Sequence, residues 1–207
     1  MHIELTEMLR CPEPHAEEFL VISTGEMLGR MIRSGLVGCP VCRREYPMRK
    51  GVVDFTGSGK REAGRVAEGP LPPSPVPLPE HAQTLQALLD LSGPGGFVVL
   101  LGSAARHAVS LAGLMGGIHF VGVNAPPDTE ELPVLSLLKA PRMIPLRQSM
   151  ARGMVVGAEL AAAPWLAEAV RVLLPGRRFV VEGEKIPLPA GTKRLASGEG
   201  LFVGEKS

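Results

Sequence analysis

The chain has 207 residues, of which 45% are hydrophobic and 4% are aromatic, and its formal net charge is +1. This length accommodates one ordinary domain and a smaller one, and the apolar fraction is sufficient for a sizeable core. The near-zero charge excludes a global attraction to nucleic acid or to an anionic membrane, and few aromatic side chains are available to stack on single-stranded bases. The composition therefore predicts a globular protein and gives no indication of a nucleic-acid partner.

Neither a targeting segment nor a membrane span is expected. Residues 1–15 contain acids and lack an apolar run, unlike a signal peptide. The most hydrophobic stretch, 97–123, contains Arg106, His107 and His119. A spanning helix would place the arginine near its centre at a cost of about 2.5–3.5 kcal/mol, whereas two buried strands around a helix avoid that cost. We therefore predict a cytoplasmic protein.

The three cysteines of the chain, Cys11, Cys39 and Cys42, lie close to its start. An odd number of cysteines, two of them in a Cys-Pro-Val-Cys arrangement, favours metal binding in a reducing compartment over a disulfide framework. Buried free cysteines and a redox role are the alternatives. The two-residue spacing allows both thiolates to reach one ion, and this pattern predicts a structural zinc site.

The fourth zinc ligand is expected in the first knuckle, which has the sequence CPEPH and begins at Cys11. Pro14 cannot bind a metal, but His15 offers an imidazole one residue further along. We therefore predict His15 as the fourth ligand. Water, His2 and Glu13 are the alternatives.

The composition changes sharply twice along the chain. Residues 1–55 hold every cysteine and end in an apolar segment at 51–55. Residues 56–79 are polar and then proline-rich, which favours an extended spacer; a ligand for a proline-binding domain is the functional alternative. We therefore predict a zinc ribbon at 1–55, a Pro-rich linker at 56–79 and a second domain at 80–207.

The second domain alternates between helical and strand-like segments. In chain order we predict a helix at 80–91, a strand at 97–101, a helix at 104–114, a strand at 118–123, short strands at 143–145 and 154–156, a helix at 164–173, a strand at 178–181 and an antiparallel pair at 193–197 and 200–204. Continuous apolar strands separated by helices indicate a parallel sheet that is covered on both faces. The predicted fold class is α/β, with a doubly wound, mostly parallel sheet.

Two regions resemble known families. The run 36–55, LVGCPVCRREYPMRKGVVDF, resembles the short zinc-ribbon family that activates tRNA and protein methyltransferases. That family has a two-cysteine knuckle, a Tyr-Pro-Ile segment, a glycine and a closing apolar strand, and segment 9–12 matches its first knuckle. Pro14 stands where the family usually has a cysteine. The resemblance implies structural zinc and a surface that docks on a protein partner.

The run 166–181, LAEAVRVLLPGRRFVV, is similar to the helix-turn-strand of class I methyltransferases that use S-adenosylmethionine. The tail at 200–206 resembles the final antiparallel strand of that family. The resemblance implies a methyltransferase-like Rossmann fold over 80–207. It also implies a cofactor site with a glycine-rich turn after the first strand and an acid at the end of the second. Gly102 and Asn124 stand at these positions and are the candidate cofactor-binding residues.

Three positions of that implied site differ from the family pattern. Ala104 replaces a small turn residue, Asn124 replaces the acid that would accept both ribose hydroxyls, and Arg152 replaces an acid before the fourth strand. Losing a bidentate carboxylate contact costs on the order of 1.5–3 kcal/mol. Several such losses would weaken micromolar binding to millimolar. No set of catalytic residues stands out.

The sequence therefore predicts a non-catalytic methyltransferase-like protein with a structural zinc ribbon, acting as a binding or scaffolding subunit of a larger assembly. A protein partner would dock through the ribbon or the Pro-rich linker. The alternative is an active S-adenosylmethionine-dependent methyltransferase that acts on RNA, protein or a small molecule. The sequence names neither the partner, the substrate nor the oligomeric state.

Overall fold

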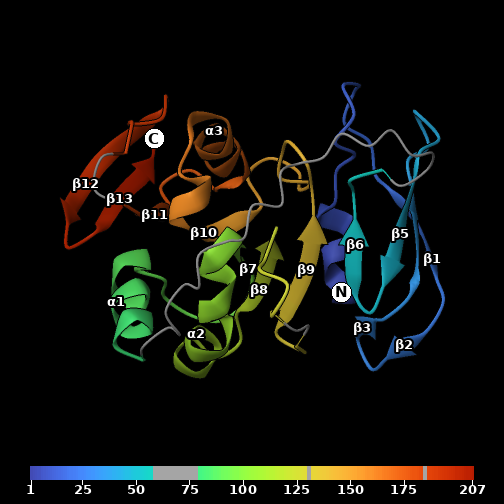
Figure 1. The fold of residues 1–207 in the computed structure, drawn as a ribbon, viewed down its shortest axis with the longest axis horizontal. Coiled ribbons are helices and arrows are strands. Elements are labelled where there is room, and N and C mark those ends of the chain that lie inside the picture. Colours follow the sequence, from blue (N-terminus) through green and yellow to red (C-terminus); the bar gives the residue numbers. More distant parts are fainter. Residues whose placement is uncertain (58–78, 130–131, 184–185) are drawn as a thin grey trace.

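The computed structural model describes residues 1–57, 79–129, 132–183 and 186–207. Most of the predicted Pro-rich linker, 58–78, lies outside the described residues. The described chain forms one eleven-stranded mixed sheet with helices on both faces, and a separate two-stranded sheet (Figure 1). Among the described residues, no helix has both the length and the apolar character that a membrane span requires.

The first part of the chain contains one 3-10 helix and six strands. They are η1 (Ile3–Met8), β1 (Val21–Thr24), β2 (Met27–Leu28), β3 (Met31–Ile32), β4 (Gly35–Gly38), β5 (Glu45–Arg49) and β6 (Val52–Asp54).

The second part alternates helices and strands as predicted. Its elements are α1 (Pro79–Leu89), β7 (Phe97–Leu101), η2 (Gly102–His107), α2 (Ala108–Leu114), β8 (His119–Val123), β9 (Leu135–Lys139), β10 (Ala151–Val156), η3 (Ala158–Leu160), α3 (Ala163–Val172), β11 (Arg178–Glu182), β12 (Thr192–Gly198) and β13 (Leu201–Lys206).

The strand order of the large sheet is β1-β4-β5-β6-β9-β8-β7-β10-β11-β13-β12. Neighbouring strands are parallel from β6 to β11, and β13 is inserted antiparallel between β11 and β12. The order reverses at β7, which has β8 on one side and β10 on the other. This confirms the predicted doubly wound, mostly parallel α/β sheet and its closing antiparallel pair.

The two faces of the sheet bury separate cores, as alternation along β7 shows. Val98 and Leu100 pack in the core covered by α1 and α2, whereas Val99 and Leu101 pack in the core that includes α3. All five residues of β7 are buried, because helices cover both sides of this central strand. The continuous apolar run that begins at Phe97 therefore reflects a strand covered on both faces, as the sequence pattern indicated.

The third strand of the parallel sheet was predicted at 143–145, and this prediction is wrong. The strand beside β8 is β9, and residues 143–145 lie in the irregular segment that follows it. Strand β9 contains Ser136, which is fully buried and accepts a hydrogen bond from the backbone N–H of His2 at 2.8 Å. The ring Nε2 of His119 lies 3.1 Å from the same hydroxyl. These partners are distant in sequence, so a local pattern cannot indicate that this serine belongs in a buried strand.

Strand β6 connects the predicted ribbon to the parallel sheet. Val53 of β6 pairs in parallel with Leu138 of β9, and the backbone N–H of Phe55 donates to the carbonyl of Lys139 at 2.8 Å. Tyr46 and Phe55 are almost fully buried, in the same core as α3. The sheet and one core therefore continue across the predicted boundary, and the division into a ribbon and a second domain stays a prediction.

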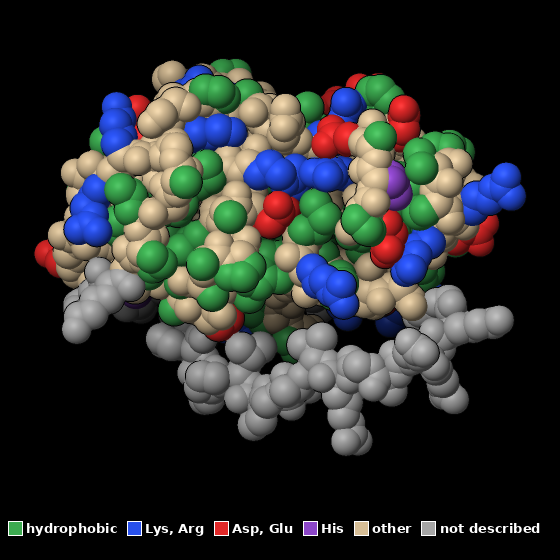
Figure 2. Space-filling view, turned by 90° about the horizontal axis from the view of Figure 1, so that it is seen from above, with side chains coloured by type: hydrophobic (Ala, Val, Ile, Leu, Met, Phe, Trp, Pro, Cys, Tyr) green, Lys and Arg blue, Asp and Glu red, His purple; other side chains and the backbone are tan. Residues whose placement is uncertain are grey.

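The surface carries charges of both signs. Figure 2 shows basic and acidic side chains interspersed across one face of the molecule, with hydrophobic side chains scattered between them. This distribution agrees with the formal net charge of +1.

Candidate functional site

The four residues predicted as zinc ligands lie together in the ribbon. The ligand atoms of Cys11, His15, Cys39 and Cys42 all lie within 4.8 Å of one another. The Sγ atoms of Cys11 and Cys42 are 3.7 Å apart, and His15 Nε2 lies 3.3 Å from Cys39 Sγ. Sulfur ligands on a zinc tetrahedron with bonds of about 2.3 Å are separated by about 3.8 Å. The spacing and the three-thiol, one-imidazole donor set both fit a structural zinc ion.

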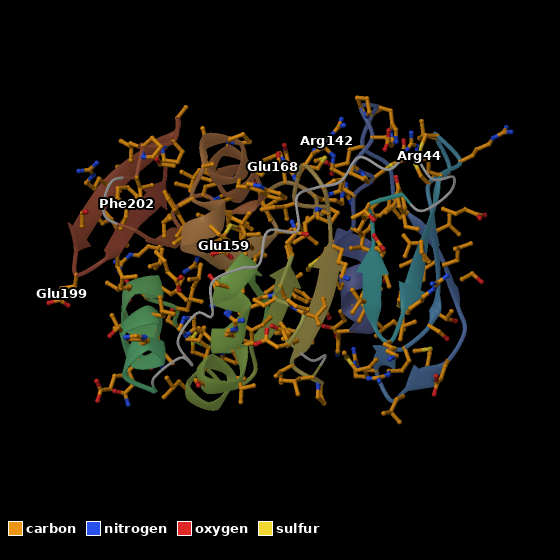
Figure 3. The ribbon with its side chains drawn as sticks, viewed as in Figure 1. Arg44, Arg142, Glu159, Glu168, Glu199 and Phe202 are labelled. Carbon is orange, nitrogen blue, oxygen red and sulfur yellow. The ribbon has the colours of Figure 1, made fainter. Side chains whose placement is uncertain are left out.

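The alternative protein ligands have other partners. The ring of His2 packs against that of His119 in a tilted arrangement, with centroids 4.6 Å apart. The carboxylate of Glu13 pairs at 3.0 Å with Arg44 (Figure 3), which lies in the turn between β4 and β5. The structure thus brings His15 into the cluster, and neither His2 nor Glu13.

The second knuckle is shaped by the turn between β4 and β5. Cys39 accepts a backbone hydrogen bond from Arg43 at 2.9 Å, and Arg43 adopts a left-handed φ of 58°. Burial opposes ionisation of Cys39, but the backbone N–H groups of Cys42 and Val41 outweigh it, so the pKa of this thiol lies below its usual value. The thiolate is the form that binds metal.

Cys11 occupies the buried side of the cluster and is 2% exposed. Burial raises the pKa of its thiol to about 11, against the opposing effect of a hydrogen bond with the Tyr46 hydroxyl, which lies 3.2 Å from Cys11 Sγ. Coordination of a divalent cation would favour the thiolate of Cys11 over the thiol, because a metal-bound thiol is deprotonated outright. Tyr46 therefore orients the sulfur from outside the cluster, as supporting hydrogen bonds do at metal sites.

Gly102 lies at the carboxyl end of β7, where the resemblance implied a cofactor turn. Its φ is +61°, and a Cβ here would meet the carboxylate of Glu159, so the present arrangement of this turn favours glycine. The backbone N–H of Ser103 donates to Glu159 Oε1 at 2.5 Å, and the Ser103 hydroxyl donates to Oε2 at 2.7 Å. Figure 3 shows Glu159 beside the upper end of the η2–α2 segment. A carboxylate of the chain itself thus occupies this turn.

Asn124 lies at the carboxyl end of β8, with φ of +54°. Its Nδ2 donates to the carbonyl of Ala140 at 2.8 Å, and its Oδ1 accepts from the Ala140 N–H at 2.8 Å. The side-chain amide therefore joins the ends of β8 and β9. An acid at this position could accept from Ala140 but could not donate to it.

Arg152 lies near the amino end of β10, whereas Gly102 follows the carboxyl end of the neighbouring parallel strand β7. The two residues are therefore at opposite ends of the strands. Its guanidinium donates to the carbonyls of Ser92 at 2.6 Å and Pro94 at 3.0 Å, which fixes the loop between α1 and β7. The arginine that replaces an expected acid thus holds a loop, away from the turn after β7.

The sequence interpretation missed the contacts made by Glu159 and by His107. Glu159 meets Ser103 across 56 positions of sequence, and His107 Nε2 lies 3.3 Å from Glu182 Oε1 across 75 positions. No motif links these residues, so no local pattern could have found the pairs. Arg106, next to His107, is held by Asp128 in a bidentate ion pair.

Comparison with protein-family models found no match, and no curated protein matches the sequence. Similar solved structures include geranyl diphosphate methyltransferase in complex with GPP and sinefungin, with 19% identity and a TM-score of 0.43 over 49% of this chain and 43% of that chain. A chain from the complex between the Haloferax volcanii Trm112 methyltransferase activator and the putative methyltransferase has 22% identity and a TM-score of 0.42, over 50% of this chain and 52% of that one. The antibiotic-resistance methyltransferase Kmr has 16% identity and a TM-score of 0.44, over 60% and 92%.

The fold class rests on the strand order of the structure itself. A mostly parallel sheet with a reversal at β7 is a doubly wound, Rossmann-like arrangement, here with an antiparallel β13 next to β11. The chain thus has a doubly wound α/β fold whose sheet is continued by a segment that holds a Cys/His cluster. Fold alone does not establish chemistry.

Proposed function

We propose that this protein is a non-catalytic, methyltransferase-like protein with a structural zinc ribbon, acting as a binding or scaffolding subunit of a larger assembly. One observation supports the proposal: side chains of the chain itself make hydrogen bonds at both candidate cofactor positions. The carboxylate of Glu159 occupies the turn at Gly102 and Ser103. The amide of Asn124 makes two hydrogen bonds to the backbone of Ala140.

A cofactor that contacts these two positions as the resemblance implies would compete with both arrangements. Displacing Glu159 breaks two hydrogen bonds to a carboxylate, which are stronger than neutral ones. Freeing the Asn124 amide breaks two more bonds, each worth about 1 kcal/mol. In return, Asn124 would offer a ribose one donor and one acceptor without a charge. These costs support weak S-adenosylmethionine binding at Gly102 and Asn124.

The ribbon supports the same role. A zinc ion bound by Cys11, His15, Cys39 and Cys42 has protein ligands at all four positions, which is typical of structural sites and leaves no open position for a substrate. Such an ion would fix the turn between β4 and β5, and these strands lead to β6 and its pairing with β9. The ribbon would thereby brace the parallel sheet of its own chain.

A protein partner would then meet the outer side of the ribbon. In the part of the chain that the structure describes, β1 pairs with β4 alone, so its other edge is open. Val21 at the start of this strand is 65% exposed. An open strand edge with exposed apolar side chains can add a strand from a partner. We propose this edge, together with the predicted Pro-rich linker, as the docking region.

Calorimetric titration of the zinc-loaded full chain with S-adenosylhomocysteine tests the proposal. We expect no binding tighter than about 100 μM, since that affinity needs roughly 5.5 kcal/mol of intact contacts. Tighter binding would favour the alternative, an active S-adenosylmethionine-dependent methyltransferase. Metal analysis of the same sample should give about one zinc ion per chain, as four ligands hold one ion, and a ratio near zero would refute the zinc assignment.

A further inference from the structure

Exposed apolar side chains are concentrated in one short segment of the ribbon. Ten large hydrophobic side chains are exposed in the described chain, and four of them fall between positions 19 and 28: Phe19, Val21, Met27 and Leu28. Ile22, also in this segment, is partly buried against the core that contains the cysteines. A concentration of exposed apolar side chains is typical of an interaction site. Strand β1 lies within this segment, so apolar side chains are available on both of its faces.

The backbone of β1 offers an edge for pairing. On one side β1 pairs antiparallel with β4, from Val21 opposite Gly38 to Thr24 opposite Gly35. Alternate residues of such a pair turn their N–H and C=O groups away from the partner strand. Among the described residues β1 is the last strand of the sheet order, and Figure 1 shows it at the outer margin of the ribbon. The strand contains neither lysine nor proline, which often protect such edges against pairing.

Acidic side chains flank this edge at both ends. Glu18 precedes β1 and Glu26 follows it, and both residues are exposed. Neither carboxylate has an ion-pair partner in the described part of the chain, whereas the neighbouring Glu17 pairs with Arg147 at 2.8 Å. Positions 16–29 contain no lysine or arginine. The edge is therefore apolar at its centre and negative at its ends, which is complementary to a strand with basic ends.

A second copy of the chain does not suit this edge. If β1 pairs antiparallel with β1 of another copy over its whole length, Phe19 of each copy faces Glu26 of the other. Each Glu26 then lies one position from Glu18 of the other copy. A register centred on Ile22 sets the two acids directly opposite each other. Like charges that face each other across a strand pair are destabilising, so the acids favour a basic partner over another β1.

The other open edge of the sheet, β12, has basic side chains that already have partners. Lys193 pairs with Glu205 at 2.7 Å, and the guanidinium of Arg194 lies 5.2 Å from the ring centroid of Phe202. The register of β12 against β13 shifts between Arg194 and Ala196, and a bulge of this kind twists an edge away from further pairing. The β12 edge of another copy is therefore a poor partner for β1.

We propose that β1 accepts a strand from a partner protein whose docking segment is extended, apolar or β-branched at its centre and basic at both ends. The partner's backbone pairs with the outward groups of β1, and its central side chains cover Val21 and Ile22. Its basic ends lie near Glu18 and Glu26. This inference rests on the docking role proposed above for the edge and specifies the kind of partner. It requires nothing of the candidate cofactor positions.

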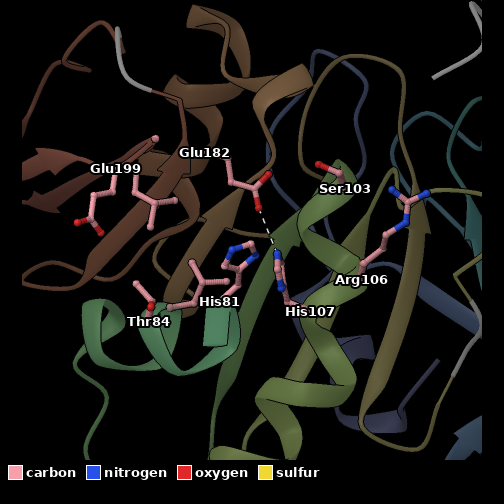
Figure 4. A pocket seen from close by; sticks show the side chains of 10 residues that line it. His81, Thr84, Ser103, Arg106, His107, Glu182 and Glu199 are labelled. Atoms are coloured by element: carbon pink, nitrogen blue, oxygen red, sulfur yellow. Dashed lines mark hydrogen bonds and ion pairs between the residues drawn. The ribbon is translucent and has the colours of Figure 1, made fainter. Parts of the chain in front are cut away.

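Nuclear magnetic resonance titration of the isotope-labelled, zinc-loaded full chain with a synthetic peptide tests the proposal. The peptide alternates valine and threonine and has a lysine at each end. We expect the backbone amide signals of β1 to shift. Those of Ser103 and His107, which line a cavity in the other half of the sheet, should stay unchanged (Figure 4). The same peptide methylated on its backbone nitrogens is the control, and its binding should be lost because it cannot donate to β1.

The charge complementarity is tested with a matched peptide that has a glutamate at each end. It should bind about three- to tenfold more weakly than the lysine peptide at low salt, and high salt should reduce the difference by screening exposed charges. Combining Glu18→Lys with Glu26→Lys should reverse the preference. Combining Glu80→Lys with Glu199→Lys makes an equal charge change at exposed positions in the other half of the chain, and should preserve it.

Three outcomes of the titrations would overturn the proposal: equal binding of the lysine and glutamate peptides, undiminished binding of the methylated peptide, or unshifted β1 amides. A concentration-dependent dimer in sedimentation velocity, with its interface at the β1 amides, would assign the edge to a second copy and would also overturn it. Failure of the peptide alone leaves the non-catalytic role intact. Conversely, S-adenosylhomocysteine binding tighter than about 100 μM would refute that role and leave the strand-docking proposal intact.

Discussion

Replacing Asn124 tests whether this residue belongs to the sheet or to a cofactor site. Its amide makes two hydrogen bonds of 2.8 Å to the backbone of Ala140. Its φ of +54° lies in the left-handed region, which asparagine adopts more readily than most residues. Both features predict that substitution destabilises the fold.

The three informative variants differ in what they remove. Asn124→Ala loses two hydrogen bonds, each worth about 1 kcal/mol, and adds a left-handed cost of about 1 kcal/mol, for a total of about 3 kcal/mol. Asn124→Gly accepts the same φ without strain and should lose only about 2 kcal/mol. Asn124→Asp keeps the acceptor for the Ala140 N–H but sets an oxygen against the Ala140 carbonyl, so we expect a loss of about 2 kcal/mol.

Urea unfolding of the zinc-loaded variants measures these losses, with the slope against denaturant checked for constancy. Calorimetry then asks whether the Asn124→Asp variant, which restores the expected acid, binds S-adenosylhomocysteine. We expect no gain, because Glu159 still occupies the turn at Ser103. An aspartate variant as stable as the wild type that binds with a Kd below about 100 μM would refute the reasoning.

The remaining predictions concern the turn, the metal and pH. Glu159→Ala should lower the free energy of unfolding by about 1 kcal/mol, since the carboxylate bonds to Ser103 are solvent-exposed; an unchanged urea midpoint would show that the contact is not formed in solution. Cys39→Ser, or chelation of the metal, should lower the melting temperature of the whole chain because β6 pairs with β9; a separate, unshifted transition for the parallel sheet would contradict this. Burial lowers the pKa of His119 to about 4, below its ordinary value of 6.5, so the unfolded chain takes up a proton first as the pH falls. Stability that is complete above pH 6.5 should therefore decline by about 1–2 kcal/mol between pH 7 and pH 5. His119→Gln should decline less in urea unfolding over the same range, and equal declines would exclude His119 as the cause.

The parallel sheet was predictable where local pattern and burial coincide. The run 97–101 is apolar at every position, and β7 is buried at every position. The pattern failed at β9, where the buried Ser136 depends on His2 and His119, both far away in sequence. The parallel pairing of β6 with β9 could not be predicted either. Which strands become neighbours is decided by tertiary packing, and the sequence of a single strand does not show it.

The candidate sites, too, could be predicted from the sequence only in part. The proximity of the three cysteines and His15 was predictable because ligand chemistry restricts residue types and spacing, and His15 followed from the exclusion of Pro14. Gly102 could be placed at the end of a strand, but the side chain that fills its turn could not. Glu159 contacts Ser103 only because β7 and β10 are neighbours in the sheet.

The central claim is that side chains of this protein occupy its candidate cofactor site, and amide hydrogen exchange of Ser103 tests it most directly. The measurement compares the zinc-loaded full chain alone with the same chain in about 1 mM S-adenosylhomocysteine, roughly ten times the affinity limit set above. The account predicts that the Ser103 amide is protected without any cofactor, since it donates to Glu159, and that protection is unchanged on addition. Fast exchange that becomes slow only when S-adenosylhomocysteine is added would contradict it.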